Sequence, residues 1–116
     1  MSLPHPLPDD LAELIARRFR AMGDPLRVRL LDSLREGEAS VGELADTVGG
    51  SVQNVSKHLR VLADAGVLAR RKEGTHVLYR IADEGVLGLC EDVCGSVAGQ
   101  LQEQLRALSL AGGGTT

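Results

Sequence analysis

The residues best suited to a chemical task lie between positions 51 and 80, and the task is binding a polyanion. This segment carries six basic and two acidic residues, a net charge of +4, whereas residues 1–50 carry six and nine and residues 81–116 carry one and five. The whole chain has a net charge of −3. An acidic chain with one basic segment is typical of a protein with a single polyanion-binding surface. On charge alone, a solvated surface without a partner fits the same pattern.

The first part of the basic segment places amide, hydroxyl and basic side chains on one face of a predicted helix, which Ser51 caps. The residues in its first turns are Gln53, Asn54, Ser56 and Lys57. Amides pair with adenine edges and lysine with guanine O6 and N7, so these residues, together with Ser51, are candidates for DNA contacts in the major groove. Arg60 follows one turn later and suits a phosphate better. The alternative is a solvated helix face.

A second group of candidate DNA contacts surrounds a predicted hairpin turn. Its members are Arg71, Lys72, Thr75 and His76. At the tip of a hairpin these side chains could reach a phosphate or an adjacent minor groove. The alternative is that the charges only keep an exposed hairpin soluble.

The chain has two cysteines, Cys90 and Cys94, which are neighbours on one face of a predicted helix. Thiolates are the ligands that soft ions prefer, so the pair could hold a thiophilic metalloid such as arsenite, or a zinc-like or nickel-like metal with help from a partner subunit. Both residues also continue an apolar stripe, and free cysteine is among the most buried residue types, which favours packing alone. Two cysteines are too few for a disulfide framework and suit the reducing cytoplasm.

Helix caps and apolar periodicity predict four helices before the hairpin. Residues 9–22 read as an amphipathic helix, and Asp24 caps a second helix. A capping box of the sequence Ser-Val-Gly-Glu begins a short helix over residues 40–48. A Gly-Gly pair separates this helix from the one that Ser51 caps. These elements place the candidate base contacts on the fourth helix.

After Gly66 the apolar period changes from helical to alternating, which predicts a β-hairpin over about residues 67–81. A last helix is expected over about residues 83–109, with an apolar stripe along one side. The predicted organisation is a flexible segment at 1–8, a single domain at 9–110 and a flexible tail at 111–116.

Two helices joined by a glycine turn, the second with a polar outer face, indicate a helix-turn-helix over about residues 40–65. With the hairpin added, the predicted fold is mainly α (α+β): a winged helix-turn-helix with a two-stranded β-wing. The first and last helices carry apolar stripes that a small core cannot wholly bury. We therefore expect them to be flanking N- and C-terminal dimerisation helices of a homodimer.

The order of several short motifs resembles the ArsR/SmtB-type winged helix-turn-helix regulators of bacteria. The resemblance covers about residues 11–82 and runs through FRAMGDPLR at 19–27, SKHL at 56–59, AGVL at 65–68, Gly74, and Tyr79-Arg80. Each motif alone is a weak signal, whereas all of them in one order are specific. The resemblance implies repression at an operator near the regulator's own promoter, with activation as the alternative.

The ligands of two metal sites that the resemblance implies are missing from this chain. Where the arsenic-type site has Cys-x-Cys at the start of the third helix, this sequence has Ser40-Val41-Gly42. The zinc-type site in the last helix has the pattern Asp-x-His, followed further along by His-x-x-His or His-x-x-Glu. In this sequence Asp83 is followed by Gly85, Ser96 and Gly99 at the corresponding positions. Cys90 and Cys94 are the remaining soft ligands.

We expect a homodimeric, sequence-specific DNA-binding transcriptional regulator. It is expected to be a repressor of the metal-, metalloid- or redox-responsive type. Its partner is expected to be an inverted-repeat operator in double-stranded DNA. The alternatives are a winged helix used for protein contacts and a family member without metal sensing. No enzyme is expected, because no phosphate loop or catalytic triad spacing occurs. No cofactor is required; a thiophilic metal or metalloid ion, if the cysteines bind one, would be an inducer. No apolar run approaches the ~20 residues of a membrane-spanning helix, so a cytoplasmic protein is expected.

Overall fold

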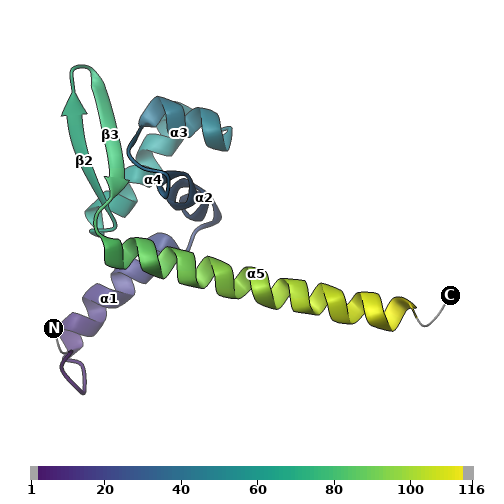
Figure 1. Ribbon diagram of the computed structural model, residues 1–116. Coiled ribbons are helices and arrows are strands. Elements are labelled where there is room, and N and C mark those ends of the chain that lie inside the picture. Colours follow the sequence, from purple (N-terminus) through teal and green to yellow (C-terminus); the bar gives the residue numbers. More distant parts are fainter. Residues whose placement is uncertain (1–2, 114–116) are drawn as a thin grey trace.

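The part of the chain that the structure describes, residues 3–113, forms five helices and three strands in this computed structural model (Figure 1). In chain order these are α1 (Asp9–Met22), α2 (Pro25–Leu34), β1 (Ala39–Ser40), α3 (Val41–Val48), α4 (Val52–Asp64), β2 (Leu68–Glu73), β3 (His76–Ile81) and α5 (Glu84–Gly113). The predicted winged helix-turn-helix is confirmed. Among the described helices, none is both long and apolar enough to cross a membrane.

The helices begin at the caps that the sequence indicates. The Asp24 carboxylate accepts a hydrogen bond of 3.1 Å from a backbone N–H in the first turn of α2. Ser40 and Glu43 form the capping box of α3, with two reciprocal bonds of 3.1 Å each. The Ser51 hydroxyl accepts from the backbone N–H of Asn54 at 3.1 Å. Such caps satisfy donors that have no partner inside the helix, which is why they locate helix starts so well.

The turn between α3 and α4 depends on a glycine. Gly49 closes α3 with φ +71° and ψ +31°, the left-handed conformation that residues with a Cβ adopt only at a cost. Its backbone N–H donates to the carbonyl of Ala45. The left-handed residue redirects the chain after one helix so that Ser51 can cap the next, and this sets the direction of α4.

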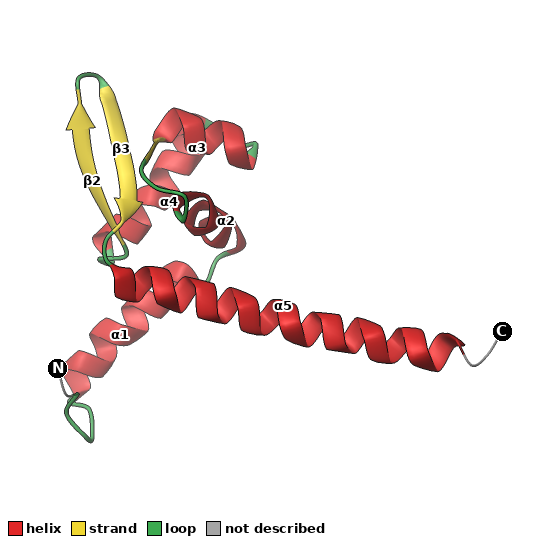
Figure 2. Cartoon of the chain, viewed as in Figure 1, coloured by secondary structure: helices red, strands yellow, loops and turns green. Residues whose placement is uncertain are grey.

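The sheet has one strand more than the predicted two-stranded wing. The strands are antiparallel in the order β1-β3-β2, so the short β1 pairs with the inner strand of the hairpin (Figure 2). Leu78 on β3 lies opposite Arg71 of β2 on one side and Ser40 of β1 on the other. A strand of two residues is too short to show an alternating pattern, so the sequence gives no sign of β1.

The core lies between α2, α3, α4 and the sheet. Its largest fully buried side chains are Tyr79, Leu30, Leu44, Leu59, Leu62, Val55 and Val67. Burying each of these leucines contributes about 2 kcal/mol. Val52 has the same helical spacing as Val55 and Leu59, which predicts a buried position, but it is 56% exposed. Val52 starts the helix, and the elements that cover the middle of α4 do not extend over this end.

α5 extends further than the predicted 83–109. It runs to Gly113, so the helix includes the first residues of the tail predicted to be flexible from 111. Glycine lowers helix propensity by about 1 kcal/mol but does not obstruct helical backbone, so a glycine-rich composition did not mark the end. The rest of that tail, residues 114–116, lies outside the described range, as do residues 1–2 of the predicted flexible segment. Residues 3–8 form neither helix nor strand.

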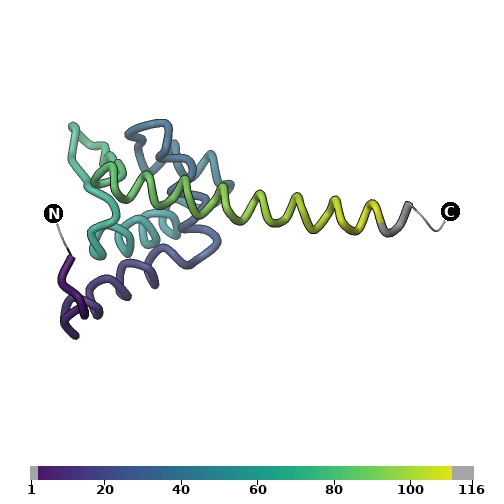
Figure 3. The backbone as a smooth tube through the Cα atoms, turned by 60° about the horizontal axis from the view of Figure 1, so that its bottom comes forward, coloured from purple at the N-terminus to yellow at the C-terminus, as the bar shows by residue number. Residues whose placement is uncertain are grey.

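Only the beginning of α5 packs on the rest of the chain. Val86 and Cys90 are buried against the core, at 4% and 7% exposure. Every side chain from Glu91 to Leu110 is exposed, and the helix projects away from the other elements (Figure 3). A helix that leaves the body with an apolar stripe needs a surface from outside this chain to cover it.

Candidate nucleic-acid interface

α4 has two distinct faces: its inner face packs in the core, and its outer face carries polar side chains. Val55, Leu59 and Leu62 are 0% exposed. On the opposite side Gln53, Asn54, Lys57 and Arg60 are exposed, and Ser56 is half-buried. The residues Gln53, Ser56, Lys57, Arg60, Val61 and Asp64 line one shallow depression along this face. The helix therefore presents amides, a hydroxyl and two cations outward from a rigid support.

Ser51 has a structural task as well as a candidate contact. Its hydroxyl oxygen accepts the capping bond from Asn54, which leaves the hydroxyl proton as the group it can donate to a ligand. The first turn of α4 is also a helix N-terminus, whose N–H groups favour an anion such as a phosphate. Both features suit the start of α4 to a DNA backbone.

The cations of the wing differ in whether they are paired with carboxylates. Lys72 and Arg70 on β2 are exposed, and within the described residues neither forms an ion pair. Thr75 and His76 are exposed at the hairpin turn, next to Gly74 with φ +63°. These side chains are free to meet a ligand at the tip of the wing.

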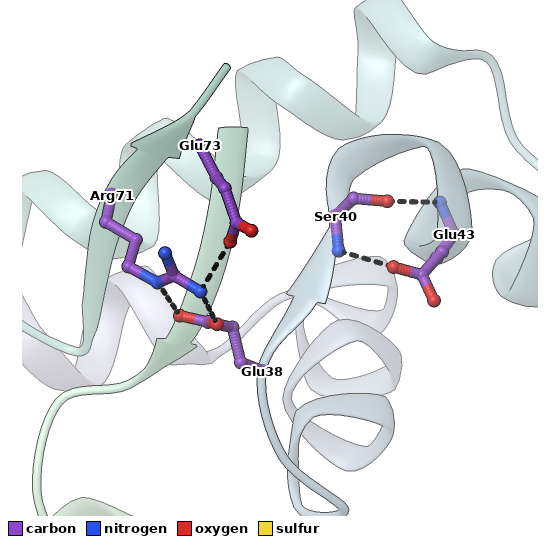
Figure 4. A network of polar contacts seen from close by, with 5 residues as sticks. All are labelled: Glu38, Ser40, Glu43, Arg71 and Glu73. Atoms are coloured by element: carbon purple, nitrogen blue, oxygen red, sulfur yellow. Dashed lines mark hydrogen bonds and ion pairs between the residues drawn. The ribbon is translucent and has the colours of Figure 1, made fainter. Parts of the chain in front are cut away.

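Arg71, in contrast, is bound to two carboxylates (Figure 4). Its Nε donates to Oε2 of Glu38 at 2.8 Å and its Nη2 to Oε1 of the same carboxylate at 2.6 Å. The same Nη2 lies 2.9 Å from Glu73. Arg71 thereby holds the pKa of the Glu38 carboxyl below its usual range, chiefly through the side-chain hydrogen bond. Nothing in the sequence indicates that β1 places Glu38 within reach of the Arg71 side chain across β3.

Two further contacts position α4. The Nδ1 atom of His58 lies 3.2 Å from Arg27 and 4.0 Å from the Asp24 carboxylate, which joins α4 to the start of α2. Arg18 of α1 donates to the carbonyl of Ala65 at 3.3 Å, at the C-terminal end of α4, where a cation is favourable. α4 is thus tied near its middle to the start of α2 and at its C-terminal end to α1.

The two cysteines line one groove but differ in exposure. Cys90 is buried and Cys94 is exposed, and both are free thiols. The groove, of 270 Å³, lies between α1, α2 and α5 and is mostly apolar, with Phe19, Met22, Leu31 and Val93 on its walls. Burial raises the pKa of the Cys90 thiol, and the adjacent Cys94 adds to this effect. The described residues contain no group of three or more His, Cys, Asp or Glu side chains placed to hold a metal ion.

Known proteins resemble this chain over most of its length. A family described as a helix-turn-helix domain matches residues 22–71. The HTH-type transcriptional regulator KmtR of Mycobacterium tuberculosis is 43% identical over 77% of this chain and 68% of its own length. The chain spans 61% of the transcriptional repressor SmtB of the same species, at 35% identity.

Solved structures agree with these relatives. A homodimeric winged helix-turn-helix DNA-binding domain from Mycobacterium bovis, described as a possible ArsR-family regulator, has a TM-score of 0.78 and 30% identity over 86% of this chain and 95% of that one. The antimony-specific transcriptional repressor AntR has a TM-score of 0.71 and 32% identity over 88% of this chain and 98% of that one. This chain belongs to the ArsR/SmtB family of winged helix-turn-helix transcriptional regulators.

Proposed function

We propose that this protein is a homodimeric repressor that binds an inverted-repeat operator in double-stranded DNA, in the cytoplasm, through α4 and the wing. The observation that carries the proposal is the division of α4 into a fully buried apolar face and an exposed face of amides, a hydroxyl and cations. Protein interfaces favour aromatic and apolar anchors instead. The start of α4 and the exposed wing cations provide sites for phosphates on either side of the base contacts.

The dimer follows from apolar residues that this chain leaves uncovered. Leu14 and Phe19 on α1 are 62% and 54% exposed. On α5, exposed apolar residues continue along the stripe: Val93, Val97, Leu101, Leu105 and Leu108. A second copy of the chain offers the same surfaces, and a two-fold axis makes them self-complementary. Two-fold symmetry then presents two copies of α4 to successive turns of the major groove.

The exposed residues divide into two roles. Gln53, Asn54, Ser56 and Lys57 are proposed to contact base edges, while Ser51, Arg60, Lys72, Thr75 and His76 are proposed to contact the backbone or the adjacent minor groove. Base contacts distinguish one sequence from another, whereas phosphate contacts strengthen binding to every sequence. The two groups can therefore be separated by comparing an operator with random DNA.

Gln53→Ala should reduce the preference for the operator over random DNA by about 10- to 100-fold, because one bidentate base contact contributes about 1–3 kcal/mol of discrimination. Lys72→Ala should weaken binding to the operator and binding to random DNA equally, so that the preference between them is unchanged. Fluorescence anisotropy with an operator recovered from genomic fragments measures both. Arg106→Ala is the control, since it removes an exposed cation from the distal half of α5. Equal effects of Gln53→Ala and Lys72→Ala on the two duplexes would contradict these roles.

We also propose that Cys90 and Cys94 bind a thiophilic ion that acts as the inducer. Both thiols line the same groove beside α1 and α5, the helices proposed to form the dimer. An ion held there can shift the dimer away from its DNA-binding geometry, provided that it binds the two states with different affinity. The name of the antimony-specific relative AntR agrees with a soft ion of this kind. The partner subunit would supply any third ligand.

Arsenite or antimonite should release the operator from the wild-type dimer, and the Cys90→Ser, Cys94→Ser double variant should keep it bound. The pKa of Cys90 is raised, so this thiol is protonated at neutral pH. The neutral hydroxides As(OH)3 and Sb(OH)3 exchange a hydroxide for each thiolate, and the hydroxide leaves with the thiol proton as water. The response should therefore change little between about pH 6 and about pH 8. A double variant that dimerises and still responds to the ion would show that both cysteines only pack.

A further inference from the structure

The Glu38–Arg71 ion pair crosses the whole width of the sheet. Side chains alternate between the two faces of a sheet, and the register places Ser40, Leu78 and Arg71 in one row across the three strands. Glu38 is two residues before Ser40 and so lies on the same face. The guanidinium of Arg71 therefore reaches from β2 past β3 to the residue that precedes β1 (Figure 4).

This ion pair connects the wing to the helix-turn-helix. Glu38 leads into β1, and Ser40 at the end of β1 is the cap of α3. Arg71 lies in the outer part of the wing, where the β2 side chains from Arg70 to Glu73 are exposed and Val77 and Leu78 of β3 are half-buried. A hairpin without further support is marginally stable in water, so a contact at its side has a large influence on its orientation.

The geometry of the contact is unlike that of most surface ion pairs. Two parallel N–H···O bonds fix the planes of the guanidinium and the carboxylate relative to each other, and Glu73 holds the same guanidinium from a second direction. Single exposed pairs contribute little, whereas bidentate pairs within a network are the exception. Because the pKa of Glu38 is lowered, the pair remains charged throughout the neutral range.

We propose that Glu38 is a positioning residue for DNA binding: it holds Arg71, and through it the wing, in the orientation in which Lys72 and the wing tip reach DNA. Arg71 is then an anchor of the wing rather than a phosphate contact. The inference rests on the proposed function, because it assigns a task within the same interface.

The proposal predicts an effect opposite in sign to simple electrostatics. A carboxylate beside a DNA-binding surface repels phosphates, so removing its charge would by itself strengthen binding. If Glu38 positions the wing, Glu38→Gln weakens binding instead, by about tenfold, because the released wing must be ordered again on each binding event. Glu36→Gln is the matched control, since Glu36 is an exposed acid in the same loop and forms no ion pair within the described residues.

The affinities of Glu38→Gln, Arg71→Ala and the double variant for one duplex should be measured by anisotropy over a range of salt concentrations. We expect each single variant to weaken binding about tenfold, the double variant to be no weaker than either, and the charge swap Glu38→Arg with Arg71→Glu to recover part of the loss. The slope of log affinity against log salt should stay unchanged in Arg71→Ala. Stronger binding by Glu38→Gln, or a slope reduced by about one per subunit in Arg71→Ala, would overturn the proposal.

A measurement without DNA separates this proposal from the proposed function. In the free protein, NMR order parameters of the Gly74 and Thr75 amides should fall in Glu38→Gln towards the flexible range below about 0.6, and stay unchanged in Glu36→Gln. Failure of the wild-type protein to bind any duplex at low salt would contradict the proposed function but not the contact between Glu38 and the wing. Unchanged wing mobility in Glu38→Gln would remove the positioning role, whatever the DNA affinity.

Discussion

Val97→Glu with Leu101→Glu should convert the dimer into a monomer at micromolar concentration. Both residues lie on the exposed stripe of α5, at 58% and 54% exposure, so glutamates there are solvated in the monomer and leave its fold intact. In a two-fold dimer the same substitutions bury four carboxylates of like charge. An unpaired buried charge costs several kcal/mol, so we expect dimer affinity to fall by about 1,000-fold or more.

Sedimentation velocity measures this change directly, and operator binding should fall with it, because a monomer can occupy only half of an inverted repeat. Gly99→Glu is the matched control. Residues two apart on a helix are separated by about 200°, so Gly99 lies opposite Val97, and a Cβ at Gly99 meets nothing within 4 Å. This variant should remain a dimer. A double variant that sediments as a dimer would show that the chain associates through another surface.

Operator affinity should fall steeply with salt. A dimer that neutralises ~6–10 phosphates loses roughly 10³- to 10⁵-fold in affinity between about 50 and about 200 mM monovalent salt, because each neutralised phosphate releases a condensed counterion. The cations available in each subunit are Arg60, Lys72, Arg70 and Arg80, with Lys57 at the base edges. Arg71 is left out of this count because it is already bound to two carboxylates, and four cations in each of two subunits place the dimer inside this range.

The slope is obtained by anisotropy titrations at several salt concentrations and one pH. Lys72→Ala should reduce its magnitude by about two for the dimer, one for each subunit. Arg106→Ala, which removes an exposed charge from the distal half of α5, should leave it unchanged. A salt-independent affinity would contradict binding through phosphates and would favour a protein partner for this surface.

Local interactions explain why much of the fold could be predicted from the sequence. Asp24, Ser40 and Ser51 each accept a hydrogen bond from a backbone N–H three residues on, so the start of a helix is encoded within four residues. The two faces of α4 follow in the same way, because a period of 3.6 residues separates Val55 and Leu59 from the polar side chains. The candidate base contacts could be named for this reason.

Features that join distant parts of the chain required the tertiary structure. Glu38 and Arg71 are separated by 33 residues, and a two-residue β1 has no periodicity by which to recognise it. The different exposure of Cys90 and Cys94 likewise depends on where the body of the protein ends beneath α5. Sequence patterns indicate which face of an element is apolar. They do not indicate which cation is neutralised or which thiol is covered, because that depends on neighbours that are far away in the chain and that only folding brings alongside.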